Sequence, residues 1–223
     1  MRGMNRRGLW TWAGAVSVLG LWASGALASP VGVSLKVNTL GAGADVTVNM
    51  GTYLNARAGF NYGQFNLLMS LDEADLDAKL RWQTVPVLLD YHPTGGGFRI
   101  SLGGVVNNNR IDLSADPYEP LTLQGVDYTI DRLDGRIEFQ RISPYFGIGV
   151  GNAVGGGRVH FACDFGVMYH GSPRVRAVAE SNLPPALQAE LDRDLQSEVD
   201  DLQDDLSGWR YYPVVSLGFS ISF

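Results

Sequence analysis

The chain has 223 residues, enough for one domain, and it combines 28 glycines with only 18% charged residues. Abundant glycine with few charges is typical of an all-β protein rather than a helical one. The formal net charge is −6, which argues against a nucleic-acid partner because such proteins need a basic surface. Cys163 is the single cysteine, so no intrachain disulfide can form.

The N-terminus has the three parts of a secretory signal peptide. Three arginines precede a mostly apolar run over residues 9–21, which is short for a membrane helix of about 20 residues. The run is followed by the cleavage-site residues Ala26, Ala28 and Ser29. We therefore expect residues 1–28 to be a signal peptide and residues 29–223 to form an exported domain. No apolar run long enough for a transmembrane helix follows Ser29.

The mature chain alternates apolar with small or polar residues in eight segments, which predicts strands with one dry face and one wetter face. An even number of such strands is typical of bacterial outer-membrane barrels. The sequence therefore predicts an all-β fold, an eight-stranded antiparallel transmembrane β-barrel. The apolar positions fall within 31–37, 44–50, 54–62, 76–91, 98–102, 146–150, 159–169 and 209–223.

Two of these segments change the parity of their apolar residues. Leu80 and Trp82 share one parity, whereas the apolar residues from Val85 onward have the other. A β-bulge near Gln83–Thr84 would explain the change. The sixth segment shows a similar break before Pro144, with Ile137 and Phe139 on the opposite parity.

Short and long connections alternate, as in barrels with tight periplasmic turns and longer extracellular loops. The fourth outer loop, 171–208, carries a helical pattern over about 185–207, which begins at Pro184-Pro185 and ends before Gly208. We expect this amphipathic helix to be a lid packed on the barrel rim or on neighbouring loops, with contact to a partner as the alternative. Its acidic residues are interpreted as a solvated face.

The chain ends in a strand whose last residues resemble the signal that barrel-assembly machinery recognises. The residues in question are Ser216, Gly218, Ile221 and Phe223. Together with the signal peptide and the amphipathic strands, this ending predicts the cell outer membrane as the location. Outer-membrane lipid and the assembly machinery are then the expected partners.

With the apolar faces outward, charged side chains point into the barrel, where burial requires them to pair. An ion-pair network that blocks the lumen and a narrow conducting path both remain open, because inward glycines leave space (Gly59, Gly103, Gly147, Gly149, Gly166 and Gly218). The predicted interior charges are Lys36, Asp45, Arg57, Lys79, Arg81, Asp90, Arg99, Glu138, Asp164 and Arg210.

Catalysis is not expected. His160, Asp164 and His170 share one face of a strand, so an acid–base pair is conceivable, but no motif places a nucleophile beside them. The two histidines are too far apart along the strand to bind one metal ion. We therefore expect no enzyme activity, no cofactor and no metal.

Four short stretches resemble the CarO-type outer-membrane proteins, a family of ornithine-uptake porins associated with carbapenem susceptibility. They are Ile142–Gly149, Gly171–Val175, Gly125–Tyr128 and Tyr211–Val214. The resemblance implies eight strands and passage of small, often basic, solutes. This chain departs from the family in ending on Phe223 rather than Trp and in its acidic, helical fourth loop.

The sequence thus favours an outer-membrane channel for diffusion of small polar, possibly basic, solutes, with acidic outer loops that enrich cations near the mouth. The alternative is a non-conducting structural or adhesive barrel that uses its loop helix as the contact element. The two hypotheses differ in the state of the lumen.

Overall fold

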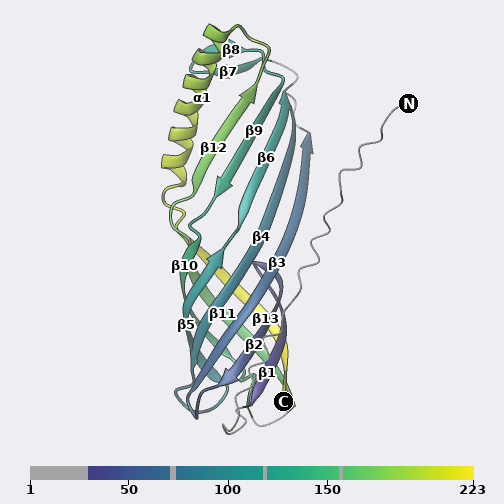
Figure 1. Cartoon of the computed structure of the whole chain (residues 1–223), viewed down its shortest axis with the longest axis vertical. Coiled ribbons are helices and arrows are strands. Elements are labelled where there is room, and N and C mark those ends of the chain that lie inside the picture. Colours follow the sequence, from purple (N-terminus) through teal and green to yellow (C-terminus); the bar gives the residue numbers. More distant parts are fainter. Residues whose placement is uncertain (1–29, 71–73, 118–119, 156–157) are drawn as a thin grey trace, which may run out of the picture.

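Eight antiparallel strands close into a barrel in the computed structural model, which describes residues 30–70, 74–117, 120–155 and 158–223 (Figure 1). Each strand pairs with its neighbours, and the β4–β5 and β1–β13 pairings complete the ring. The predicted fold class is therefore confirmed. The expected signal peptide and its cleavage site lie outside the described residues. The barrel strands are β1 (Val31–Asn38), β2 (Gly41–Asn49), β3 (Leu54–Ser70), β4 (Ala74–Tyr91), β5 (Phe98–Asn107), β10 (Ile142–Val150), β11 (Val159–Tyr169) and β13 (Tyr211–Ser222).

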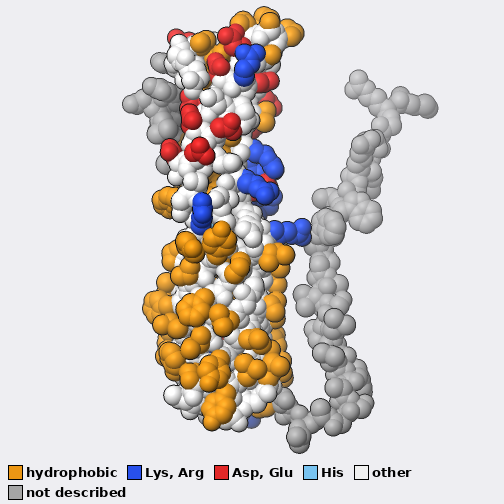
Figure 2. Space-filling model, turned by 90° about the vertical axis from the view of Figure 1, so that its left-hand side faces the viewer, with side chains coloured by type: hydrophobic (Ala, Val, Ile, Leu, Met, Phe, Trp, Pro, Cys, Tyr) orange, Lys and Arg blue, Asp and Glu red, His pale blue; other side chains and the backbone are white. Residues whose placement is uncertain are grey.

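The outside of the barrel is an apolar belt that fills the lower half of the molecule (Figure 2). Leu35 and Val37 on β1 and Phe219 on β13 are among its exposed side chains. The next residue along each strand points inward, and many of these inward residues are polar and buried, such as Thr47 and Ser220. This is the reverse of a water-soluble barrel, and it suits a barrel surrounded by lipid.

A second part of the molecule, which we call the head, rises above one side of the barrel (Figure 1). The upper parts of β3 and β4 continue beyond the barrel and pair with three further strands in the order β3-β4-β6-β9-β12. A two-stranded hairpin and a helix complete the head. Its elements are β6 (Arg110–Pro117), β7 (Leu121–Leu123), β8 (Val126–Tyr128), β9 (Arg132–Glu138), β12 (Arg174–Glu180) and α1 (Pro185–Leu206).

The bulge predicted near Gln83–Thr84 is wrong. β4 keeps one register with β3 from Leu54↔Tyr91 to Ser70↔Asp75, and one register across β5 and β6 on its other side. Leu80 and Trp82 therefore share the inner face with Thr84, and Trp82 packs on the apolar cluster inside the barrel mouth. The apolar residues change parity along β4 because the surroundings of the strand differ between the barrel and the head. Below, the outer face is apolar; in the head, the inner face is covered by protein and the outer face is charged.

The sixth segment behaves in the same way. It consists of two strands, β9 and β10, whose pairings with β6 and β5 follow one register, as in Arg110↔Glu138 and Val106↔Ile142. Ile137 is thus an inner-face residue of the head. Its parity differs from that of the belt residues because, as at Trp82, the inner face of the head is the one covered by protein.

Helix α1 packs on the inner face of the head sheet, beside β12 and β7 (Figure 1). Its buried side chains Leu191, Leu195 and Val199 repeat every four residues, as expected for one face of a helix. The Tyr128 hydroxyl donates to Asp194 Oδ2 at 2.7 Å. This hydrogen bond, together with burial, raises the pKa of Tyr128 to about 12, so the hydroxyl remains a donor at neutral pH.

The predicted helix over about 185–207 is thus confirmed as α1. Within the described ranges, no helix is both long enough and apolar enough to cross a bilayer.

Candidate functional site: the barrel interior

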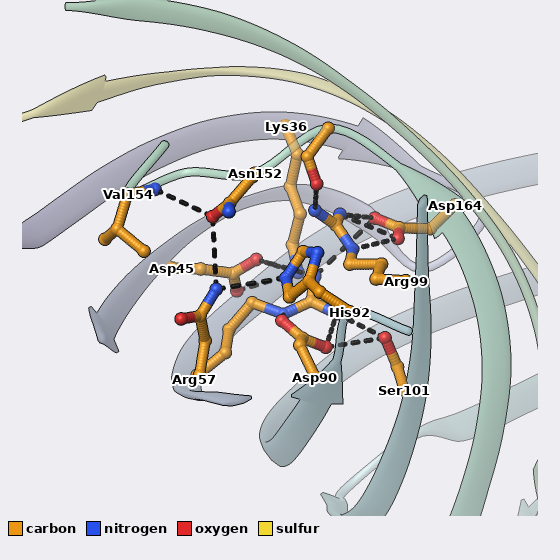
Figure 3. A network of polar contacts seen from close by, with 12 residues as sticks. Lys36, Asp45, Arg57, Asp90, His92, Arg99, Ser101, Asn152, Val154 and Asp164 are labelled. Carbon is orange, nitrogen blue, oxygen red and sulfur yellow. Dashed lines mark hydrogen bonds and ion pairs between the residues drawn. The ribbon is translucent and has the colours of Figure 1, made fainter. Parts of the chain in front are cut away.

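Six charged side chains from six strands meet in the middle of the barrel (Figure 3). Lys36 Nζ lies 2.7 Å from Asp45 Oδ2, and Arg99 Nη2 lies 2.7 Å from Asp164 Oδ1. The cations and carboxylates are equal in number, so the network is electrically balanced. We call it the ionic layer, and it consists of Lys36, Arg57, Arg99, Asp45, Asp90 and Asp164.

Arg57 is the centre of the ionic layer. Its Nε is 2.9 Å from Asp90 Oδ2, although that N–H is not aligned for a hydrogen bond. Its Nη1 is 3.6 Å from Asp45 Oδ2 and 3.5 Å from Asp164 Oδ2. Ser101 joins the group, since its hydroxyl donates to Asp90 at 2.6 Å and accepts from Arg57 at 3.2 Å.

The ionic layer is almost fully shielded from solvent, with Asp45 and Asp90 each 2% exposed and Arg57 7% exposed. Buried charges are tolerated when opposite charges and hydrogen bonds surround them. The same balance means that loss of one member leaves an uncompensated charge in the interior. The layer is consequently a rigid, mutually dependent unit.

An apolar layer closes the barrel above the charges. Its centre is Met168, which is 0% exposed, and Leu40 joins it from the turn between β1 and β2. Trp82 and Tyr212 pack against the group at its edge. The buried members of the layer are Leu40, Leu88, Val105, Tyr145, Met168 and Val214.

The opposite end of the barrel is closed by the turn between β10 and β11. Ala153 and Val154 of this turn are buried. Asn152 Oδ1 accepts from Asn55 Nδ2 at 3.1 Å and from the Val154 amide at 3.2 Å (Figure 3). His92, buried beside them, has Nε2 at 3.0 Å from Asn55 Nδ2. These polar contacts hold the turn inside the barrel wall.

The inward glycines do not leave open space, contrary to the prediction. A methyl group at Gly59 would collide with the Asp45 carboxylate, and one at Gly149 would collide with Asp164. The ring of Tyr145 lies across Gly147 and Gly166 in the same way. These four glycines thus give room to neighbouring side chains rather than to solvent.

Two small cavities lie within the barrel, with volumes of 30 and 20 Å³. The larger lies between the ionic and apolar layers, and the smaller lies between the ionic layer and Ala153. A water molecule needs about 10–15 Å³ of such space, so each cavity has room for only about one to three water molecules. Cavities of this size do not form a solvated path for solutes.

The glycine contacts give a first prediction. Gly166→Ala should destabilise the barrel by about 1–3 kcal/mol, the usual cost of overpacking, because its Cβ would lie 2.7 Å from Tyr145 Cε2. Gly104→Ala is the matched control, because nothing lies within 4 Å of a Cβ there. Urea unfolding of the refolded barrel measures both. Equal stability of the two variants would mean that Tyr145 does not occupy this space.

Four charges predicted for the interior lie elsewhere. Lys79 and Arg81 are on the outer face of the head, in the part of β4 above the barrel. Glu138 belongs to β9 and is 3.0 Å from Arg176 Nη1. Arg210 precedes β13, and its Nε donates to the Ser207 carbonyl at 2.8 Å. The expected bulge would have turned Lys79, Arg81 and Glu138 inward, but the register is unbroken, so they point outward. Arg210 lies above the barrel, before β13 begins.

The structure also adds interior residues that the sequence analysis did not select. They are Ser101, Asn55, Asn152 and His92, which are uncharged or weakly basic and so are not marked by charge on the inward face. Ser101 is two residues after Arg99 on β5, so the alternation of the strand does predict that its side chain points inward.

His160, Asp164 and His170 do not assemble into a catalytic group. Asp164 is held by Arg99, and the histidines lie four and six residues away along the strand, roughly 13 and 20 Å at 3.3 Å per residue. In the part of the chain that the structure describes, no three or more His, Cys, Asp or Glu side chains are grouped to hold a metal ion. Cys163 lies on the outer face of β11, opposite Leu217 and Val150.

Comparison with known proteins supports the architecture. No protein-family model and no curated protein sequence matches the chain. The crystal structure of Acinetobacter baumannii CarO2 aligns with a TM-score of 0.59 and 17% identity, over 89% of this chain and 100% of that chain. That of Acinetobacter baumannii CarO aligns with a TM-score of 0.57 and 19% identity, over 87% and 98%. At this identity the likeness establishes the fold, so the resemblance seen in the sequence is confirmed: the chain has the CarO-type fold.

Proposed function

We propose that this chain is a Gram-negative outer-membrane protein whose closed barrel is a non-conducting anchor for the head on the cell surface. The observation that carries the proposal is the filled lumen. An apolar layer, a balanced ionic layer and an inserted turn follow one another along the barrel, with cavities of only 30 and 20 Å³ between them. Eight-stranded barrels are just wide enough for their side chains to fill the interior.

The apolar belt supports the outer membrane as the location. Aromatic side chains are exposed at both of its edges, as in the aromatic girdles of outer-membrane barrels. Tyr62 and Tyr211 lie at the edge next to the head, and Tyr53 and Tyr91 lie at the opposite edge. The opposite end carries short connections, which is usual for the periplasmic side. The head would then face the outside of the cell.

A channel for small polar solutes is the competing function. The acidic α1 helix could raise the local concentration of cations, as the sequence analysis supposed. The filled interior favours the anchor, because solute passage would require both the ionic and the apolar layers to rearrange. Steady conduction by the wild-type protein would decide for the channel.

Export and assembly complete the proposal. Cleavage before Ser29 would deliver the mature chain to the periplasm, and Ser216, Gly218, Ile221 and Phe223 would present the assembly signal. Phe223 is 80% exposed at the end of the chain. Its ring contributes little to packing and is available for recognition by the barrel-assembly machinery.

Cysteine labelling on intact cells tests this orientation. Ser197 is exposed on α1, and Thr94 is exposed in the turn between β4 and β5 at the other end. Ser197→Cys should react with a bulky, membrane-impermeant maleimide polymer on intact cells, whereas Thr94→Cys should react only after the outer membrane is broken. The native Cys163 should stay unlabelled because it lies in the belt. Labelling of Thr94→Cys but not Ser197→Cys on intact cells would contradict the proposal.

A further inference from the structure

The outer face of the head sheet has its charges sorted by height above the apolar belt. Strand register places Gln64, Arg81, Arg110, Glu138 and Arg174 side by side in the first row above the belt edge at Tyr62 and Gln83. Asn66, Lys79, Asp112, Arg136 and Arg176 form the second row. These two rows contain six cations and two carboxylates. We call the cations the basic band: Lys79, Arg81, Arg110, Arg136, Arg174 and Arg176.

The rows above the basic band are mainly acidic. Asp77 and Asp134 stand in the third row with Ser114 and Val178. Above them, Arg132 is the single cation, between Glu180 and Asp116. A sheet that needed charge only for solubility would mix both signs over its whole height. The positive charge gathers instead where the protein surface changes from apolar to polar, as Figure 2 shows for the side of the molecule that carries α1.

The basic band is only partly neutralised by the protein itself. Asp112 is shared by Arg136 at 2.7 Å and Arg110 at 3.0 Å, and Arg176 pairs with Glu138. Lys79 pairs with Asp77 of the third row at 3.0 Å. Within the described part of the chain, Arg81 and Arg174 form no ion pair. Burial raises the pKa of Asp112, but the hydrogen bond from Arg136 and the charge of Arg110 outweigh it and hold the pKa below its ordinary value. Asp112 therefore stays ionised and keeps both guanidinium groups on this face.

The height and shape of the basic band fit a lipid headgroup. Rows two residues apart are about 7 Å apart on a strand. The headgroup layer is about 5–8 Å thick on each side of a bilayer, so both rows would fall within it when lipid surrounds the belt. Guanidinium groups match the geometry of phosphate oxygens.

We propose that the basic band binds the phosphate groups of a phosphorylated glycolipid in the outer leaflet beside the β3–β12 side of the barrel. The proposal rests on the proposed outer-membrane location and adds a lipid partner to it. The contact would be one-sided, because the strands β13, β1 and β2 have no such extension above the belt. Bound lipid would hold the head at a fixed height over the membrane surface.

Titration of the refolded full barrel with lipid A in neutral detergent tests the proposal, with bound lipid counted by native mass spectrometry. Each Lys or Arg near an anionic surface adds about fivefold in affinity. Arg81→Gln/Arg174→Gln/Arg176→Gln should therefore bind lipid A about a hundredfold more weakly. Arg132→Gln, which removes a guanidinium from the same face but from the acidic rows, should change the affinity by less than about threefold. Removal of the lipid phosphates should weaken wild-type binding as much as the triple substitution does.

Three results would overturn this assignment: equal binding by wild type and the triple variant, indifference to the lipid phosphates, or an equal loss in Arg132→Gln. Insertion of the wild type into phosphatidylcholine vesicles is followed separately by its heat-modifiable gel mobility. If the protein inserts but shows no phosphate preference, the lipid proposal alone is wrong. If it does not insert, the outer-membrane location is wrong, and the lipid proposal falls with it.

Discussion

Replacing Arg57 with methionine should lower the free energy of unfolding of the barrel by about 3–5 kcal/mol, the usual cost of breaking a buried ion pair from one side. Methionine keeps the approximate length of the side chain but removes the charge. Asp45, Asp90 and Asp164 would then share only Lys36 and Arg99. Urea unfolding of the protein refolded in detergent or vesicles measures the change.

The control substitution removes a guanidinium group whose ion pair is exposed to solvent. Arg132 is 48% exposed and lies 3.3 Å from Asp134, so Arg132→Met should change stability by less than about 1 kcal/mol. Replacing both members of a buried ion pair should also destabilise the barrel less than replacing one member, because no unpaired charge remains. Arg99→Met/Asp164→Leu is therefore expected to be more stable than Arg99→Met alone. If Arg57→Met and Arg132→Met have the same stability, the ionic layer does not support the barrel.

Truncation of Leu191 should release the helix of the head while the barrel stays folded. Leu191 is 0% exposed and packs with Leu123, Tyr128 and Ile130. Leu191→Ala should cost about 2–5 kcal/mol through lost contacts and the cavity left behind. The loss should be local, since α1 packs mainly on β12 and β7.

Limited proteolysis reports this local opening. Leu191→Ala should be cleaved within 183–208 much faster than wild type, while the heat-modifiable mobility of the barrel is unchanged. Leu202→Ala is the matched control on the same helix, because Leu202 is 44% exposed and its loss should have little effect. Loss of the barrel fold in Leu191→Ala would show that the head and the barrel are one cooperative unit.

The barrel could be predicted from sequence because lipid imposes a strict rule on its outer face. Every second residue must be apolar, so Leu35, Val37, Phe219 and their counterparts form a pattern that no soluble segment imitates over eight strands. Helix α1 could be predicted for a similar reason, since Leu191, Leu195 and Val199 repeat at the spacing of a helix face. Both patterns are local in the chain.

The head could not be predicted in the same way, because its strands follow a different rule. Lys79 and Arg81 point away from the barrel axis, like Val85 and Val87 lower on the same strand. The sequence does not mark the height at which lipid gives way to water, so the change of parity at Trp82 resembled a bulge. Knowledge of the partner strands was needed, because only the unbroken register across β3, β5 and β6 excludes an inserted residue.

The state of the lumen could not be predicted either, because it depends on which inward side chains meet across the barrel. Gly166 is compatible with an open pore or with a ring placed against it, and Tyr145 comes from another strand. Leu40 and Ala153 belong to turns whose direction, into or away from the lumen, has no local signature. Whether the lumen is filled could therefore be seen only in the three-dimensional structure.

Conductance of the refolded wild-type protein in planar bilayers tests the closed barrel most directly. The ionic and apolar layers predict a silent membrane at moderate voltage and physiological salt. Arg99→Ala/Met168→Ala, which removes a member of each layer, should leak, and so provides the evidence that the protein is inserted. Regular, solute-permeable current steps from the wild type would contradict the closed anchor and establish the channel.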